Sequence, residues 1–207
     1  MPLPLSPNVT FGLHSQMPTV ADTRKLVKLA EDGGFSAIAV GDHLAFALPI
    51  LDPFVQLAQV VALSDTLNVH TSVFLLPLRH PVPVAKQAAT LDRVSGGRFV
   101  MGLGVGGEFP GEFAAAGVPH NQRGARLNEG IEVLRKLWTG EPVAHAARSG
   151  QVCAGATTAQ QTLLLRGELD PSVVGRCLSC PEGTVAVAEV RRTPSVLGVA
   201  LGVALGG

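Results

Sequence analysis

An aspartate and a histidine stand side by side directly after a run of apolar residues, in the segment 37-AIAVGDHLAF-46. Imidazole exchanges protons near neutral pH, so His43 is a candidate catalytic acid or base. The pair stands where a strand would leave the core and meet a bound ligand. Two structural alternatives stay open: Asp42 could only orient the His43 ring or cap the next segment, and His43 could be a polar strand end without a catalytic role.

A glycine-rich run, 102-GLGVGG-107, is the second feature that could serve a ligand. It begins like the dinucleotide fingerprint G-x-G-x-x-G, but the segment 108-EFP-110 follows it. Pro110 is expected to exclude an immediate helix, which weakens a dinucleotide interpretation. The close approach of a flat ring or of another backbone explains the glycines better.

Other polar residues have weaker claims to a function. His14 follows the first predicted strand and is equally compatible with a functional and a structural role. His80 stands between two prolines and is expected to shape a loop. The segment 91-LDRVSGGR-98 is expected to form a turn from a helix to a strand. The pair Cys177-x-x-Cys180 is only half of a zinc site, so we predict no metal.

Hydrophobic patterning predicts the elements that must position these residues. Four strands are expected at 10–14, 35–41, 68–76 and 98–104. Helical patterns follow them, with a capping box at Thr19 and Asp22, an N-cap at Asp52, and apolar stripes at about 84–94 and 123–138. Strands that alternate with amphipathic helices indicate an α/β fold with a parallel sheet.

A parallel sheet binds ligands at the carboxyl ends of its strands. Polar and glycine residues of this chain follow the strands at those ends, namely His14, Asp42 and His43, the third-strand residues Thr71 and Ser72, and the glycine-rich run after the fourth strand. We therefore expect them to gather at one edge of the sheet.

Composition narrows the possible partners. The chain has 207 residues, 46% of them apolar, and a formal net charge of zero, which favours neither nucleic acid nor an anionic membrane. Residues 1–20 lack the pattern of a secretory signal, and the longest apolar stretch, 196–207, is shorter than the ~20 residues of a spanning helix. We expect a soluble cytoplasmic protein that acts on a small molecule.

The βα pattern stops near residue 143. The remainder lacks Phe, Trp, Tyr, Lys and Met, holds all three cysteines, and ends in the repetitive stretch 196-VLGVALGVALGG-207. Short apolar runs at 162–165 and 184–190 are its only strand candidates. We therefore divide the chain into a domain at 1–143 and an atypical tail at 144–207, for which a frameshift, a truncation or disorder is the hypothesis.

The stretch 74-FLLPLRHPVPVAKQAATLDRVSGGRFVMGLGVGGEFPGEFAAAGVPHNQRGARLNEGIEVLRKLW-138, together with 40-VGDH-43, resembles the bacterial luciferase-like monooxygenase family. The resemblance covers about residues 8–143. It implies a (β/α)8 TIM barrel, of which this chain would form the N-terminal half with about four βα units. It also implies FMN or the deazaflavin coenzyme F-420 bound at the carboxyl ends of the strands.

The resemblance also implies roles for individual residues. His43 matches the family's active-site acid or base, and Asp42 matches the aspartate beside the flavin ring. The third strand would carry a bulge with a non-prolyl cis peptide against the ring, at Thr71, Ser72 and Val73, with Ser72–Val73 as the candidate bond. The loop after the fourth strand would contact the ring and its side chain through Gly104, Gly106, Gly107 and Glu108.

By this resemblance the chain is an oxidoreductase that transfers hydride or activates oxygen at the bound ring. The alternative is a truncated, inactive fragment that acts at most as a weak flavin-binding or interaction module. A barrel of this kind has about 250 residues. Half a barrel would leave two open sheet edges and an exposed apolar inner face, so we expect such a chain to form a homodimer, to aggregate or to bind cofactor poorly.

Overall fold

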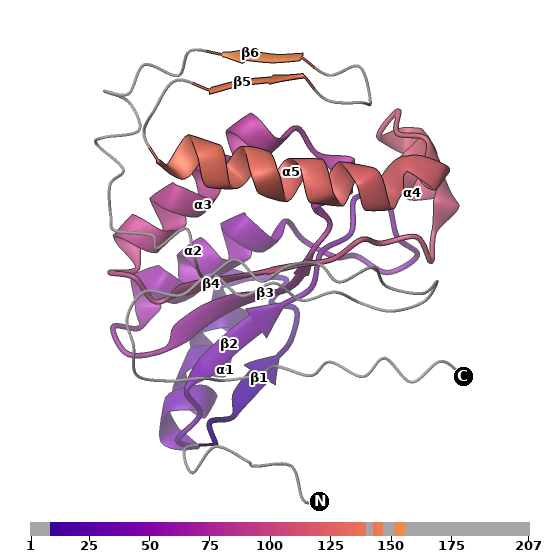
Figure 1. Ribbon diagram of the computed structural model, residues 1–207. Helices are drawn as coiled ribbons and strands as arrows, with labels where there is room; N and C mark the ends of the chain where they lie inside the picture. Colours follow the sequence, from indigo (N-terminus) through magenta and orange to yellow (C-terminus); the bar gives the residue numbers. More distant parts are fainter. Residues whose placement is uncertain (1–8, 140–142, 147–151, 156–207) are drawn as a thin grey trace, which may run out of the picture.

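The computed structural model describes residues 9–139, 143–146 and 152–155 (Figure 1). Its centre is a parallel sheet of four strands in the order β1-β2-β3-β4. The strands are β1 (Gly12–His14), β2 (Ala37–Val40), β3 (Asn68–Phe74) and β4 (Phe99–Leu103). Each predicted strand is present within a few residues of its expected range, and the predicted parallel arrangement is confirmed.

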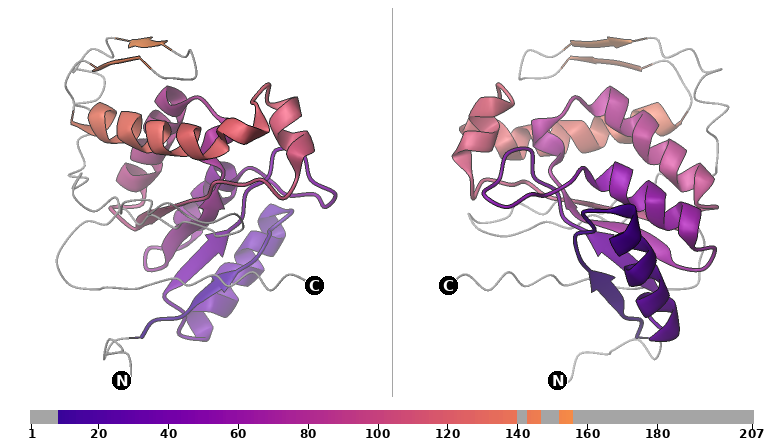
Figure 2. Two further views of the ribbon diagram at one scale, coloured as in Figure 1. Left: turned by 45° about the vertical axis from the view of Figure 1, so that its right-hand side comes forward. Right: turned by 180° about the vertical axis from the view of Figure 1, so that it is seen from behind.

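Helices cover one face of this sheet, as the two views of Figure 2 show. They are α1 (Val20–Asp32), α2 (Pro53–Leu63) and α3 (Pro81–Val94), and α5 (Arg123–Trp138) packs beside α3. None of the helices in the described part of the chain is long and apolar enough to cross a membrane. The predicted α/β alternation, with four βα units, is confirmed.

Capping side chains set the starts of two helices as the sequence predicts. The Thr19 hydroxyl accepts the N–H of Asp22 at 3.1 Å before α1. The Asp52 carboxylate accepts the N–H of Val55 at 3.1 Å, with Pro53 as the first residue of α2. Each cap satisfies a backbone donor that the helix itself leaves unpaired.

The segment around α3 is structural, as expected, although its start was misjudged. His80 Nδ1 accepts the N–H of Val82 at 3.3 Å, so the helix begins at Pro81 rather than near Val84. At its other end Ser95 Oγ accepts the N–H of Arg98, which makes the predicted turn into β4. His80 and the turn therefore define the two ends of α3 and have a structural role.

The expectation that Pro110 excludes an immediate helix is wrong. A short helix α4 (Pro110–Ala115) begins at this proline, and the 3-10 turn η2 (His120–Gln122) leads from it to α5. Proline is well suited to the first helical position, because the ring presets φ and the missing N–H would be unpaired there anyway.

One face of the sheet packs against the helices and holds the core. Ile38, Val40, Val69, Phe99 and Met101 are buried there among apolar side chains of α1, α2, α3 and α5. In the first part of β3, the buried Val69 and Thr71 alternate with less buried residues, as a sheet with two different faces requires. The 3-10 helix η1 (Leu76–Leu78) closes the core at the carboxyl end of β3.

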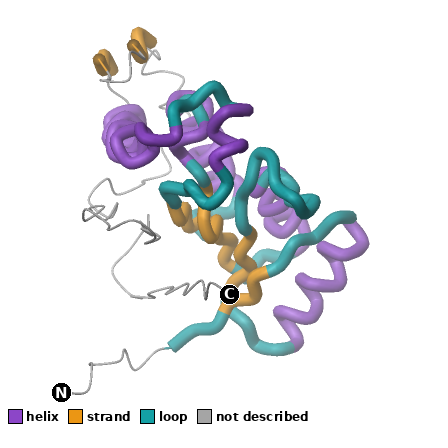
Figure 3. The backbone as a smooth tube through the Cα atoms, turned by 90° about the vertical axis from the view of Figure 1, so that its right-hand side faces the viewer, coloured by secondary structure: helices purple, strands orange, loops and turns teal. Residues whose placement is uncertain are grey.

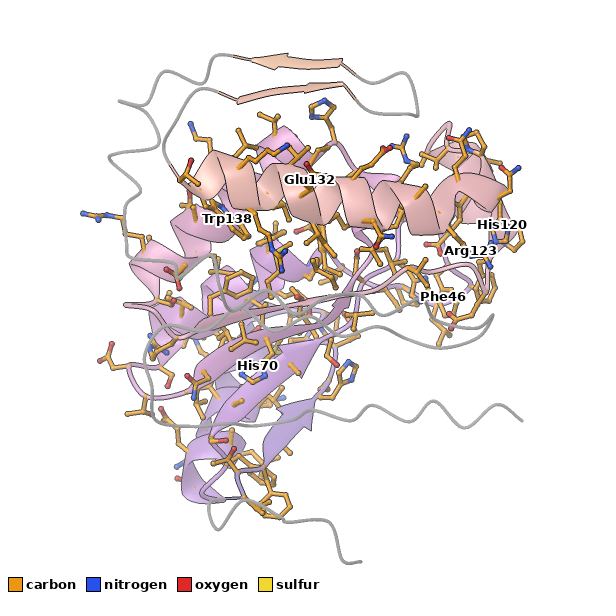
Figure 4. The ribbon with its side chains drawn as sticks, in the orientation of Figure 1. Phe46, His70, His120, Arg123, Glu132 and Trp138 are labelled. Carbon is orange, nitrogen blue, oxygen red and sulfur yellow. The ribbon has the colours of Figure 1, made fainter. Side chains whose placement is uncertain are left out.

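The opposite face of the described strands mixes polar and apolar side chains, so it is less apolar than expected. His14, Ala39, His70 and Val100 stand in register across the four strands. Figure 4 labels His70 on this face, and Figure 3 shows the sheet edge-on with α1 and its neighbours on the other side. Ala39 is the short side chain of this row, so a flat molecule can approach the backbone most closely there.

The proposed tail begins within a two-stranded antiparallel pair, β5 (Val143–Ala146) with β6 (Val152–Gly155). The sequence analysis did not predict this pair, and Cys153 lies in it. The strand candidates at 162–165 and 184–190 and the Cys177–Cys180 pair lie outside the described residues. The division of the chain at 143/144 stays a prediction.

Gly104 provides a test of the packing at the carboxyl end of β4. A Cβ added there would overlap Cγ2 of Val73 and crowd its Cβ at 3.2 Å, and a short branched side chain cannot move aside easily. Gly104→Ala should lower the free energy of unfolding by about 1–3 kcal/mol. Gly124→Ala, in open space within α5, is the matched control and should be neutral or stabilising. Urea unfolding measures the unfolding free energy of both variants. If the two substitutions changed it equally, the close packing at Gly104 would be contradicted.

Candidate active site

The Asp42 carboxylate is buried and fully engaged at the carboxyl end of β2. Its Oδ2 accepts the N–H of Leu75 at 2.8 Å and Nη1 of Arg79 at 2.6 Å, and its Oδ1 accepts Nη2 of Arg79 at 2.6 Å. This bidentate pair ties the loop after β2 to the segment after β3. The alternative that Asp42 orients the His43 ring is wrong, because its oxygens are committed to Arg79 and Leu75.

Burial raises the pKa of the Asp42 carboxyl above its ordinary value of 3.8, while the Arg79 charge and the Leu75 N–H oppose the rise. A raised pKa means that the folded state favours the protonated form. The contribution of Asp42 to stability therefore falls as the pH rises from about 3.8 through the folded pKa. Arg79 limits this loss.

His43 stands beside this pair but is held by different groups. Its Nδ1 lies 2.9 Å from Oε2 of Glu112, and its ring stacks on Phe46 with the centroids 4.1 Å apart. Phe109 closes the cluster, with its ring edge-on to Phe46 at 4.4 Å. The His43 side chain keeps 19% of its surface exposed, so it is fixed on one side and accessible on another.

Glu112 is the functional residue that the sequence analysis missed. It lies in the first turns of α4, with a side chain only 2% exposed. Its Oε1 accepts the N–H of Leu44 at 2.7 Å and that of Ala45 at 3.1 Å, while Oε2 faces His43. The only sequence signal was an acidic residue in an apolar setting after Pro110, where we did not expect a helix.

The third strand is distorted where the resemblance implies. The pairing of β3 with β4 shifts register after Thr71, and the peptide bond Ser72–Val73 is cis. The expected non-prolyl cis bond is thus confirmed in position. The buried Thr71 hydroxyl donates to the Gly102 carbonyl at 2.8 Å, and the Ser72 carbonyl lies 3.3 Å from Nε2 of His14. Thr71 therefore joins strands, while Ser72 faces the open side of the sheet.

The first glycines of the loop after β4 allow the backbone of the loop to pack closely and to turn. Gly104 packs against Val73, and Gly106 has φ +62°, a conformation that favours glycine. An added Cβ at Gly106 would lie 3.4 Å from Leu75 and from Phe113. These two glycines bring the loop close to the distorted part of β3.

The rest of that loop meets the start of α5. The Gly107 carbonyl lies 3.0 Å from Nε2 of His120, and an added Cβ at Gly107 would lie 2.8 Å from Nε of Arg123. Glu108 is exposed. Figure 4 shows His120, Arg123 and Phe46 at the same end of the molecule. The structure thus brings the loop to the strand ends, although Glu108 points into solvent.

The arrangement can move a proton and accept a flat ligand. His43 offers its second ring nitrogen, Nε2, which has no hydrogen-bond partner within 9–139. The adjoining sheet face has a short side chain at Ala39, which pairs with His14 nearer the carboxyl ends, so a planar group can lie close to the backbone there. In the described part of the chain, no three His, Cys, Asp or Glu side chains converge on a metal site.

Comparison with known families agrees with this geometry. The sequence profile of the luciferase-like monooxygenases matches residues 5–189. The chain belongs to the luciferase-like monooxygenase family. The profile match continues beyond residue 143, where the resemblance that we recognised in the sequence ends.

Members of the family with a stated activity are among the relatives. The chain is 31% identical over 143 residues to the oxygenase component of a flavin-dependent trigonelline monooxygenase from Acinetobacter baylyi, covering 63% of this chain and 40% of that protein. It is 26% identical to the monooxygenase RslO1 from Streptomyces bottropensis, with a TM-score of 0.63 over 73% of this chain and 49% of the other.

A third match supports the fold alone. A coenzyme F-420-dependent secondary alcohol dehydrogenase, solved with an F-420-acetone adduct, superposes with a TM-score of 0.62 at 20% identity over 72% of this chain and 48% of that one. The chain spans about half the length of the relatives that it matches. Its four βα units thus correspond to about half of a luciferase-like fold.

Removing Arg79, the partner of Asp42, should make the free energy of unfolding depend more strongly on pH. Arg79→Met leaves the buried carboxylate uncompensated, which should cost about 3–5 kcal/mol of unfolding free energy near pH 8. The loss should shrink toward acidic pH, because the raised pKa of Asp42 lets the carboxyl become neutral. Urea unfolding across this pH range measures the effect, with Asp42→Asn/Arg79→Met as the control that removes the charge. A loss that does not change with pH would contradict the buried pair.

Proposed function

We propose that this chain forms the ring-binding half of a flavin- or deazaflavin-dependent oxidoreductase. The observation that carries the proposal is His43, which is held by a buried carboxylate at the carboxyl end of β2 with Nε2 available. This is the end of a parallel sheet at which ligands bind. FMN and coenzyme F-420 are the two candidate cofactors, because the family resemblance implies them.

The residues present suit such a ring. The backbone at Ser72–Val73 and the loop at Gly104 and Gly106 would hold it from the side of β3 and β4, as the family resemblance implies. Above the open sheet face the short side chain of Ala39 leaves room for a planar group. A bound flavin or deazaflavin supplies the redox chemistry, either hydride transfer or the activation of oxygen.

The chain's own residues supply position and proton transfer. His43 is proposed as the catalytic residue, which exchanges a proton with the substrate at Nε2. Phe46 and Phe109 shield one side of the imidazole from water. Asp42 and Arg79 fix the loop that carries His43, so Asp42 is proposed to act through the backbone and not by touching the ring.

The two candidate cofactors each occur in a protein that the chain resembles in sequence or in fold. The Acinetobacter baylyi relative is named as flavin-dependent, while the secondary alcohol dehydrogenase is named as F-420-dependent. We propose a small organic molecule as the substrate, and neither nucleic acid nor membrane as a partner. A second copy of this chain is the proposed partner for the open edge strands β1 and β4.

One alternative rests on a specific observation. Because the chain spans about half the length of its relatives, the alternative is an inactive fragment that binds flavin at most weakly. The two functions differ in how tightly the strand ends bind the cofactor.

Cofactor binding should therefore be measured by its effect on stability. At a hundredfold excess over the dissociation constant, a ligand that binds only the folded state adds about 2.7 kcal/mol to the unfolding free energy. We expect this gain with FMN or with coenzyme F-420, and none with AMP, which lacks the tricyclic ring. No gain with either cofactor would overturn the proposal and favour the inactive fragment.

A further inference from the structure

We infer that Glu112 is a positioning residue that sets the tautomer of His43. The two oxygens of its buried carboxylate have different partners. Oε1 accepts two backbone N–H groups, from Leu44 at 2.7 Å and Ala45 at 3.1 Å, so this oxygen is committed to the loop. Oε2 is left to face Nδ1 of His43 at 2.9 Å.

An ionised carboxylate can only accept hydrogen bonds, so Nδ1 of His43 must carry a proton. In the neutral imidazole the other nitrogen, Nε2, is then the acceptor. The stacking of the ring on Phe46, at an interplanar angle of 19°, restricts rotation that would exchange the two nitrogens. Glu112 therefore presents Nε2 as a proton acceptor at the strand ends.

The two backbone donors to Oε1 also explain why position 112 needs a glutamate and not a glutamine. In Glu112→Gln the amide oxygen would stay with the two backbone donors, since turning it away would set an NH₂ group against two N–H groups. The amide NH₂ would then face His43 and donate to Nδ1. The substitution should reverse the tautomer of His43 while it keeps both loop hydrogen bonds.

This inference rests on the proposed function only for its catalytic meaning, because the tautomer exists without a cofactor. The test is nitrogen NMR of the full chain with ¹⁵N-labelled histidine at pH 8, without ligand. His43→Asn identifies the His43 signals by their loss. The unprotonated ring nitrogen should be Nε2 in the natural chain and Nδ1 in Glu112→Gln.

Two controls separate a positioning role from general damage. The signals of His80, which caps α3, should not change in Glu112→Gln, which reports that the fold is kept. Glu132→Gln, the same substitution on the exposed face of α5, should leave the His43 tautomer as it is (Figure 4).

The natural chain decides the question even if Glu112→Gln does not fold. A proton on Nε2 of His43 at pH 8 in the natural chain would overturn the inference, and so would an unchanged tautomer in a folded Glu112→Gln. If NMR shows the wrong tautomer, the proposal that the chain binds a cofactor still stands. If no cofactor binds, the assignment of the tautomer still stands. The two proposals are thus distinguished.

Discussion

The hydrogen bonds of the Glu112 carboxylate connect two loops that lie far apart in the sequence. The acceptor stands in α4, after the fourth strand, and its donors lie 67–69 positions earlier, in the loop after the second strand. Both loops can meet because β2 and β4 run parallel and end at the same edge of the sheet. Charge-assisted hydrogen bonds contribute about 1.5–3 kcal/mol each, and the burial of the carboxylate makes an unpaired state costly.

A second buried carboxylate, at the carboxyl end of β2, also joins two loops. Asp42 joins the loop after β2 to the segment after β3 through Arg79 and Leu75. The loop between β2 and α2 is therefore held on both sides, and the catalytic candidate His43 lies between the two attachments. Rigid support of this kind keeps a reacting side chain in place, so that less order has to be imposed when a ligand arrives.

The sequence could predict the elements because their signals are local. The apolar run before Gly41, the cap at Thr19 and the Asp52-Pro53 pair each specify a strand or helix end within a few residues. The carboxyl-end position of His43 followed from the alternation of strands and helices. The position of the cis bond at Ser72–Val73 came from the family resemblance and not from a local pattern.

The partners of the site residues could not be predicted in this way. Whether Asp42 or Glu112 holds His43 depends on how separate loops meet in space, and two adjacent residues in the sequence need not face each other. The helix at Pro110 was missed because proline was read as a helix breaker, although it is favourable at a first helical position. The inner sheet face is less apolar than expected because the expectation did not take account of His14 and His70, which lie on that face.

The central claim is that His43 borders the bound ring at the carboxyl ends of the strands. The most direct measurement is a titration of the histidine-labelled full chain with FMN and with coenzyme F-420, followed by NMR. The account predicts that the His43 ring signals shift strongly as the cofactor binds, while those of His80 stay unchanged. Saturable binding that leaves the His43 signals unmoved would contradict it.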